Sequence, residues 1–277
     1  MKFINKELDF SNNTIYIMGI LNVTPDSFSD GGKYNNRDRA LFHVEEMIKN
    51  GADIIDVGGE STRPFSEPVS EGEEIDRVIP IIEKINNNFK TIISIDTYKS
   101  KVAEEACKNG AEIINDISGF TFDSKMIDIA KEYDTACVVM HIKGTPKNMQ
   151  SDPQYDNVIR EIYSFLDDRV DALRREGLSK IIIDVGFGFG KSLDDNYILL
   201  DHLDEFKKMY CPIMAGISRK SMIGKIAESK PEERISGTIA LNTLAVMKGA
   251  RIIRVHDVKE SRQMAKVLEK YLTVQGE

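Results

Sequence analysis

The stretch Lys180-Ile-Ile-Ile-Asp-Val-Gly-Phe-Gly-Phe-Gly-Lys191 shows a pattern that repeats along the chain. Its three consecutive isoleucines predict a short strand that is buried on both faces. The run ends at a carboxylate, Asp184, and glycines follow at positions 186, 188 and 190. One carboxylate at a strand end is a weak sign of function, because acidic side chains are common at protein surfaces. Seven other apolar runs also end in a polar residue before a turn, and this repetition is what makes the pattern informative.

The repeated pattern predicts a barrel. The eight predicted strands cover residues 15–21, 52–58, 91–96, 111–118, 136–141, 181–183, 212–218 and 250–256, with helical patterns about 10 to 18 residues long between them. Strict alternation requires parallel strands with right-handed crossovers, and eight such units match a (β/α)8 TIM barrel whose active site lies at the carboxyl ends of the strands. We expect one domain over residues 1–277, with a barrel core at about 15–258 and a carboxyl-terminal helix at about 259–273.

An open, doubly wound sheet is the competing architecture, and it would carry a glycine-rich phosphate turn after its first strand. The turn here is Asn22-Val-Thr-Pro25, which contains no glycine. The sequence Gly190-Lys191-Ser192 also fails as a phosphate-binding P-loop, because the required earlier glycine is replaced by Val185. We interpret these glycines as a rim that lets the backbone approach a flat ligand, with Phe189 available for stacking.

The composition excludes several classes of function. Apolar residues make up 41% and charged residues 30% of the chain, and the net charge of −8 argues against a nucleic acid partner. No apolar run reaches the ~20 residues that cross a membrane, and the charged start does not resemble a signal peptide. The three cysteines are scattered and expected to be reduced, so we expect a cytoplasmic protein. Basic residues nevertheless follow several strands, which suits a small anionic substrate: Arg63, Lys143, Lys191, Lys220 and Arg254.

Residues that end the strands of a barrel are expected to converge on one pocket. The predicted strand ends are Asn22, Asp56, Asp96, Asn115, Met140, Asp184, Ser218, Arg254 and His256. Asp56 and Asp116 are candidates for a purely structural role, in which their hydrogen bonds only stabilise the ends of the strands.

Two further motifs suggest an anionic ligand. The sequence Ser218-Arg-Lys-Ser221 predicts a helix start, which could hold an anion or could be a plain helix cap with solvated cations. Arg254 and His256 lie on one side of a strand, and two cation-capable groups together suit a diphosphate. The histidines are not spaced as a zinc pair, so Mg²⁺ that bridges Asn22 and substrate phosphates is the better fit.

Six motifs in this order along the chain resemble those of the dihydropteroate synthase family. They are Asn22-Val-Thr-Pro-Asp-Ser-Phe-Ser-Asp-Gly-Gly32, Asp56-Val-Gly-Gly-Glu-Ser-Thr-Arg-Pro64, Ser94-Ile-Asp-Thr97, Asn115-Asp-Ile-Ser-Gly119, Ser218-Arg-Lys-Ser221 and Arg254-Val-His-Asp257. The resemblance implies a TIM barrel, usually a homodimer, that joins (7,8-dihydropterin-6-yl)methyl diphosphate to 4-aminobenzoate, releases pyrophosphate in folate biosynthesis and is inhibited by sulfonamides.

The resemblance also implies roles for individual residues. Asn22 would bind the Mg²⁺ that holds the leaving diphosphate. The pterin diphosphate would contact Thr62, Asp96, Asn115, Asp184, Lys220, Arg254, His256, Met140, Ile117, Gly216 and Phe189. The 4-aminobenzoate would contact Thr62, Arg63, Pro64, Phe189, Lys220, Ser221 and Phe28. The residues closest to the chemistry would be Lys220, Asp184, Asp96, Arg63 and Asp30.

The chemistry of these side chains agrees with the implied reaction. Asp184 can accept two hydrogens from a pterin edge, while Lys220 and Asn115 can donate to the ring oxygen. If the C–O bond breaks before the C–N bond forms, a cationic pterin methylene develops, and cations with Mg²⁺ stabilise the departing diphosphate. We expect the first two loops, with Phe28 and Asp30, to cover this cation and exclude water.

The chain departs from the family pattern after the sixth strand. Val185 and Phe187 stand where proline and isoleucine are usual. Since both residues are apolar, we expect Asp184 to keep its orientation.

Two other functions remain as alternatives. A folate-dependent methyltransferase of the same barrel family would share a pterin pocket, but it would have no use for the Asn22 loop or the Ser218–Ser221 motif. An inactive pterin-binding module would be expected to have lost Lys220, Arg63 or Asp184, and all three are present.

Overall fold

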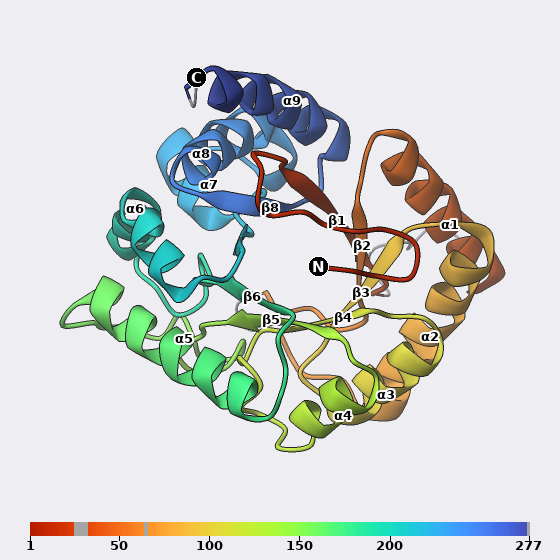
Figure 1. Cartoon of the computed structure of the whole chain (residues 1–277). Helices are drawn as coiled ribbons and strands as arrows, with labels where there is room; N and C mark the ends of the chain where they lie inside the picture. Colours follow the sequence, from red (N-terminus) through yellow and green to blue (C-terminus); the bar gives the residue numbers. More distant parts are fainter. Residues whose placement is uncertain (25–32, 64–65, 276–277) are drawn as a thin grey trace.

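Eight parallel strands close into a barrel in which each strand pairs with the next and β8 pairs with β1 (Figure 1). The structure is a computed structural model that describes residues 1–24, 33–63 and 66–275. The strands are β1 (Tyr16–Asn22), β2 (Ile54–Gly58), β3 (Ile92–Asp96), β4 (Ile113–Asp116), β5 (Ala136–Met140), β6 (Ile181–Asp184), β7 (Ile213–Ala215) and β8 (Ala250–Val255). The prediction of a TIM barrel is confirmed.

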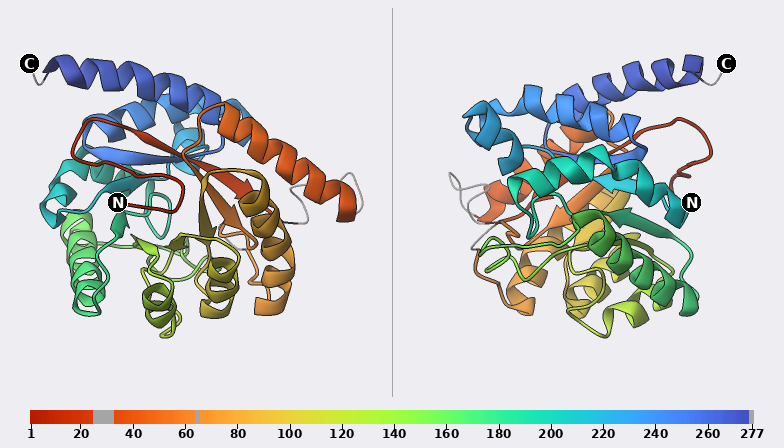
Figure 2. Two further views of the ribbon diagram at one scale, coloured as in Figure 1. Left: turned by 45° about the vertical axis from the view of Figure 1, so that its right-hand side comes forward. Right: turned by 90° about the vertical axis from the view of Figure 1, so that its left-hand side faces the viewer.

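Helices form a layer outside the strands (Figure 2). They are α1 (Lys33–Lys49), α2 (Glu71–Asn88), α3 (Ser100–Lys108), α4 (Met126–Glu132), α5 (Val158–Arg175), α6 (Leu193–Asp201), α7 (Ser221–Ala227), α8 (Ile235–Met247) and α9 (Val258–Gln275), with short 3-10 helices η2 (Leu203–Met209) and η3 (Pro231–Glu233). The prediction of 10 to 18 residues was too long for four of the helices, since α4 and α7 have 7 residues and α3 and α6 have 9. Among the described helices, none is both long and apolar enough to cross a bilayer.

Two strands end at least two residues earlier than predicted, for reasons that lie in the loops, and β5 and β8 each end one residue earlier. The strand β4 stops at Asp116 because this buried carboxylate accepts from the backbone N–H groups of Ser118 at 2.7 Å and Phe120 at 3.1 Å and so turns the chain. The strand β7 stops at Ala215, and the chain then turns at Arg219, whose φ of 57° lies in the left-handed region. The residues beyond each strand are thereby free to form the rim of the barrel.

One end of the barrel is filled by apolar side chains. Alternate residues of each strand point inward, as the period of two requires, and those of the lower layer are Tyr16, Met18, Ile54, Ile92, Ile113, Ala136, Val138, Ile182, Met214 and Ile252. The amino-terminal segment crosses this end, and Leu8 is fully buried among these side chains (Figure 1). The opposite end, where the strands finish, is left for polar residues.

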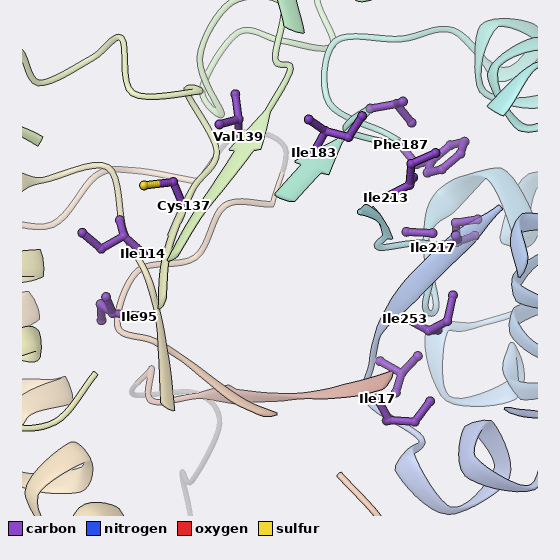
Figure 3. Close-up of a cluster of buried hydrophobic side chains, with 14 of the residues drawn as sticks. Ile17, Ile95, Ile114, Cys137, Val139, Ile183, Phe187, Ile213, Ile217 and Ile253 are labelled. Carbon is purple, nitrogen blue, oxygen red and sulfur yellow. The ribbon is translucent and has the colours of Figure 1, made fainter. Parts of the chain in front are cut away.

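The remaining strand residues point outward and pack against the helices. Figure 3 shows this outer core, which includes Ile95, Val139 and Ile253. Val185 and Phe187 are fully buried in the same cluster, so the residues that depart from the family pattern pack away from the barrel interior.

Candidate active site

Polar side chains of neighbouring strands meet inside the carboxyl end of the barrel. Arg254 donates through Nε to Asp56 Oδ2 at 2.6 Å and through Nη2 to Asp96 Oδ2 at 2.5 Å. Asn115 donates through Nδ2 to the same Asp56 oxygen at 3.1 Å. Along a strand, side chains two or four positions apart point to the same face. Each of these residues lies two or four positions after an apolar residue that fills the barrel interior, so its side chain also points inward. Four strands thus contribute to one hydrogen-bonded network.

The charges of this network do not balance. The pKa of Asp96 is raised to about 7. Burial is the main cause, Arg254 opposes the shift, and the nearby Asp56 adds to it. Burial alone would lower the pKa of Arg254, but the two carboxylates outweigh it and raise that pKa. One guanidinium is therefore shared between two carboxylates, and the floor of the pocket favours a ligand that presents hydrogen-bond donors.

Asp184 and Lys220 form the neighbouring wall. Asp184 Oδ1 accepts from the backbone N–H of Gly186 at 2.7 Å, and its other oxygen faces the open space at Gly216, 3.6 Å from where a Cβ would lie. Lys220 Nζ donates to the Phe187 carbonyl oxygen. Burial lowers the pKa of Lys220 to about 8, although Asp184 acts in the opposite direction. An acceptor and a donor are thus available on one side of the pocket.

Apolar side chains complete a narrow slot. Ile117 and Met140 are buried in a small cluster that also contains Ile142 and Met149, and Phe189 packs against it. Lys220 Nζ lies 4.4 Å from the centroid of the Phe189 ring. The absence of side chains at Gly188 and Gly216 keeps the space beside Lys220 and Asp184 free, which suits a flat ring system.

His256 is not the second cation that its spacing suggested. Its Nδ1 lies 3.0 Å from Ser218 Oγ, and burial lowers its pKa to about 4, with Arg254 and Arg219 adding to the shift. The ring is therefore neutral near pH 7. It can offer a hydrogen bond to a diphosphate, and the negative charge of that ligand would raise the pKa of the ring.

Lys191 also departs from expectation. Its side chain is buried, and Nζ donates to the carbonyl oxygens of Phe189 at 2.9 Å and His141 at 3.2 Å. Burial lowers the pKa of Lys191 well below its ordinary value. The expected gathering of basic residues at the pocket therefore includes Lys220 and Arg254 but not Lys191, which joins two loops instead.

The remaining predicted residues lie around the rim. Asn22 ends β1, and a Cβ on Gly58 would lie 3.7 Å from its Oδ1 and 3.6 Å from Asp96 Oδ2. Thr62 is half-buried and Arg63 is exposed in the loop after β2, while Ser221 is exposed at the first position of α7. Phe28, Asp30 and Pro64 lie outside the described residues.

Sequence reasoning missed the supporting residues of this site. Asp56 was a candidate for a structural role alone, yet it orients both Arg254 and Asn115. Glu60 and Lys99 form a buried ion pair of 2.5 Å beneath the loop after β2. No signal in the sequence pairs these two residues, because they lie on different strand–helix units.

Comparison with known proteins gives a consistent result. Residues 18–256 match the family described as pterin binding enzyme, a range that spans nearly the whole barrel. Dihydropteroate synthase from Clostridium beijerinckii is 47% identical over 272 residues, which cover 97% of this chain and 98% of the relative. The chain belongs to the dihydropteroate synthase family.

Solved structures agree with this assignment. Dihydropteroate synthase from Yersinia pestis, in a complex with a sulfonamide drug, has a TM-score of 0.92 and 42% identity, and the match covers 99% of both chains. The enzyme from Clostridium difficile, in the presence of pteroic acid, has a TM-score of 0.90 and 43% identity and covers 96% of this chain and 99% of that one. The prediction of a dihydropteroate synthase is confirmed, and these relatives do not support the methyltransferase alternative.

Proposed function

We propose that the chain condenses (7,8-dihydropterin-6-yl)methyl diphosphate with 4-aminobenzoate in the pocket at the carboxyl end of the barrel. The observation that carries this proposal is the set of acceptors and donors beside an apolar slot, in which Asp184 and Asn115 are buried and Asp96 and Lys220 are half-buried. A buried polar group without a partner is costly, so such a set favours a ligand with matching donors and acceptors. A pterin ring provides both on its edge.

The proposed contacts follow from this match. Asp184 accepts from the amino group and the adjacent ring N–H of the pterin, and Lys220 donates to the ring oxygen. Asn115, which already donates to Asp56, is in place to add a further hydrogen bond. The ring then lies against Met140 and Ile117, and Phe189 closes the slot.

The chemical step is proposed to be a dissociative substitution. The C–O bond to the diphosphate breaks first, and the amine of 4-aminobenzoate then attacks the pterin methylene cation. An aromatic amine is a free nucleophile near pH 7, so no strong general base is needed. The side chains of the pocket bind, orient and exclude water, while Arg254, Thr62 and the neutral His256 would hold the diphosphate as its negative charge grows.

Mg²⁺ is proposed as the cofactor. Among the described residues, no three His, Cys, Asp or Glu side chains could hold a metal ion together. Mg²⁺ commonly binds through one or two protein oxygens and completes its shell with water and substrate phosphates, so the side-chain oxygen of Asn22 at the end of β1 fits this mode. When bound, the ion would neutralise charge on the leaving diphosphate.

The 4-aminobenzoate is proposed to lie outside the pterin, between the rim residues. Thr62 and Arg63 lie in the loop after β2, and Lys220 and Ser221 lie at the start of α7. The exposed guanidinium of Arg63 and the hydroxyl of Ser221 suit a carboxylate. A sulfonamide resembles this substrate, and the Yersinia pestis relative was solved with one, so we propose that sulfonamides compete for the same place.

We also propose a homodimer that forms through the face of α6, α7 and α8. These helices are neighbours (Figure 1), and each exposes a large apolar side chain: Ile198, Ile226 and Leu244. The helix α8 adds Met247 and is apolar around most of its circumference, although one side already packs on the barrel. A second copy of the chain would cover this face. The cytoplasmic location stays a prediction.

The function is tested with the purified chain, the pterin diphosphate, 4-aminobenzoate and Mg²⁺. We expect equal amounts of 7,8-dihydropteroate and pyrophosphate, and neither product when 4-aminobenzoate is left out. Pyrophosphate release that does not depend on 4-aminobenzoate would show hydrolysis, and this result would contradict the proposed condensation.

A further inference from the structure

The loop after β2 carries Thr62 and Arg63, and buried charges hold its two ends together. Glu60 lies two residues after the end of β2, and its Oε2 accepts from the backbone N–H of Val69 at 3.1 Å, just before α2 begins. Lys99 Nζ donates to the same Glu60 oxygen at 2.5 Å and to the Val69 carbonyl oxygen at 2.7 Å. One ammonium group and one carboxylate therefore close the base of this loop.

The same ammonium group joins the loop base to the scaffold. Lys99 is the residue before α3, and its Nζ also donates to Glu74 Oε2 of α2 at 2.6 Å. The hydroxyl of Tyr98 donates to Glu60 Oε1 at 2.5 Å. The side chains of Lys99, Glu60 and Glu74 are only 12%, 6% and 1% exposed, so these ion pairs are poorly screened by water.

A gain in stability alone does not account for the ion-paired triad of Lys99, Glu60 and Glu74. Taking such groups out of water costs about as much as their attraction returns, and apolar side chains of similar size often serve equally well. The triad does supply a defined geometry, because each charged atom has a specific partner. Hydrogen bonds between described residues of the loop are local, such as those from Ser66 Oγ to the Ser61 carbonyl oxygen at 2.5 Å and from Ser66 N to the Arg63 carbonyl oxygen at 3.1 Å. The loop also contacts the loop after β5 through Glu67, which pairs with Lys147 at 3.0 Å, but both of these side chains are exposed.

We propose that Lys99 is a positioning residue for the 4-aminobenzoate half of the reaction. It acts through Glu60, which fixes the base of the loop and so sets where Thr62 and Arg63 lie over the pocket. Lys99 itself touches neither substrate. This inference rests on the proposed function, in which 4-aminobenzoate lies beside this loop.

The proposal predicts separate effects on the two substrates. Lys99→Met is expected to raise the KM for 4-aminobenzoate about tenfold and to lower kcat, because Thr62 and Arg63 lose their fixed position. The Kd for the pterin diphosphate, measured by calorimetry, is expected to change less than about twofold, since Asp184 and Lys220 are untouched. Lys99→Arg, which keeps a cation at this position, is expected to restore most of the lost affinity for 4-aminobenzoate.

Two further variants distinguish a lost positioning role from general misfolding of the protein. Lys101→Met removes a neighbouring lysine that pairs with Glu71 across the same two helices, at 3.6 Å, but is 71% exposed, and it is expected to behave as wild type. The double variant Lys99→Met with Glu74→Gln removes the more deeply buried of the two carboxylates that lose their cation, while Glu60 keeps its hydrogen bonds from Tyr98 and Val69. It is expected to fold and to show the same raised KM. An unchanged KM in both Lys99→Met proteins would overturn the proposal, as would an equal loss of affinity for the two substrates.

Arg63→Ala tests the underlying assignment separately. If Arg63→Ala raises the KM for 4-aminobenzoate and Lys99→Met does not, then Lys99 has no positioning role, but 4-aminobenzoate still binds beside this loop. If Arg63→Ala also leaves this KM unchanged, 4-aminobenzoate does not lie beside the loop, and the inference fails with that assignment.

Discussion

Lys220 and Asp96 are half-buried at the carboxyl end of the barrel, where partial loss of water works against the charge of each. The pKa of Lys220 is lowered to about 8 and that of Asp96 is raised to about 7. Groups shifted in this way beside charged partners are typical of active sites, because only a bound ligand can replace the water they have lost. These residues are therefore expected to contribute to binding and to oppose folding.

Replacement of Lys220 tests whether this residue contributes to ligand binding while it opposes folding. Lys220→Met is expected to weaken binding of the pterin diphosphate by about tenfold or more, because a charged hydrogen bond is lost. The melting temperature near pH 7 is expected to stay the same or rise, because the cost of burying the ammonium is fully present below about pH 8 and an uncharged side chain removes it. The difference should vanish as the pH rises from 8 towards the ordinary lysine pKa of 10.5, where the unfolded chain binds more protons than the folded protein. Calorimetry and thermal unfolding measure the two effects. Wild-type affinity in this variant would remove Lys220 from the pterin site.

The pH dependence of binding follows from the same residue. Below about pH 8 Lys220 is protonated and can donate with full charge, and above it the ammonium is lost. We expect the affinity for the pterin diphosphate to fall as the pH rises from 8 to 10, after correction for the titration of the free ligand. Calorimetry across this range checks the prediction. An affinity that stays constant would mean that Lys220 remains charged or makes no contact.

At the scale of elements, the loops after β5 and β6 fit tightly together. A Cβ on Gly186, whose φ is +69°, would lie 2.0 Å from the His141 carbonyl oxygen, and one on Gly190 would lie 2.4 Å from that of Lys143. Lys191 adds a hydrogen bond between the same two loops, from its Nζ to the His141 carbonyl oxygen at 3.2 Å. The contact fixes the backbone that holds Asp184 and Phe189, so the shape of the slot depends on both loops.

Substitutions of two glycines test whether the contact between these loops supports pterin binding. Gly186→Ala is expected to lower pterin affinity about tenfold or more and to reduce the melting temperature, because either the His141 backbone or the loop must move. Gly177→Ala is the matched control, since Gly177 also has positive φ, +87°, but nothing lies within 4 Å of its Cβ position. The control is expected to lose about 1 kcal/mol of stability from its backbone conformation and no affinity. Equal affinities in the two variants would contradict the role of the contact.

At the scale of the whole molecule, the two ends of the barrel have different tasks. The amino-terminal segment and the lower apolar layer close one end, and the charged network occupies the other. The outer helices bury most of their apolar faces against the strands, but α8 leaves Leu244 51% and Met247 38% exposed. An exposed apolar face of this kind suits a second copy of the chain.

A charge on this face tests the proposed dimer. Leu244→Glu is expected to shift the protein from dimer to monomer, because a carboxylate would be buried in the interface without a partner. Val267→Glu on α9, where Val267 is 69% exposed, is the matched control and is expected to leave the dimer intact. Analytical ultracentrifugation measures the mass of each. A monomeric wild type would contradict the dimer, and a dimeric Leu244→Glu protein would place the interface elsewhere.

The sequence by itself determined the architecture and the residues at its open end. Strand and helix periods are local properties, and alternating direction along a strand is enough to turn Asp56, Asn115 and Asp184 inward once a barrel closes. The ordered motifs determined the family in the same way, because they consist of consecutive residues. That Asp184 keeps the family's orientation beside Val185 and Phe187 stays a prediction, although both neighbours are buried as their apolar character indicated.

Only the tertiary structure decided how these residues act on one another. Arg254 pairs with Asp56 and Asp96 of distant strands, Lys191 is buried between two loops, and burial makes the ring of His256 neutral. Ion pairing and pKa depend on desolvation and on neighbours across the barrel, and neither quantity is a property of the local chain. For this reason the sequence could name most of the pocket but could not assign its charges or find the buried Lys99 that supports its rim.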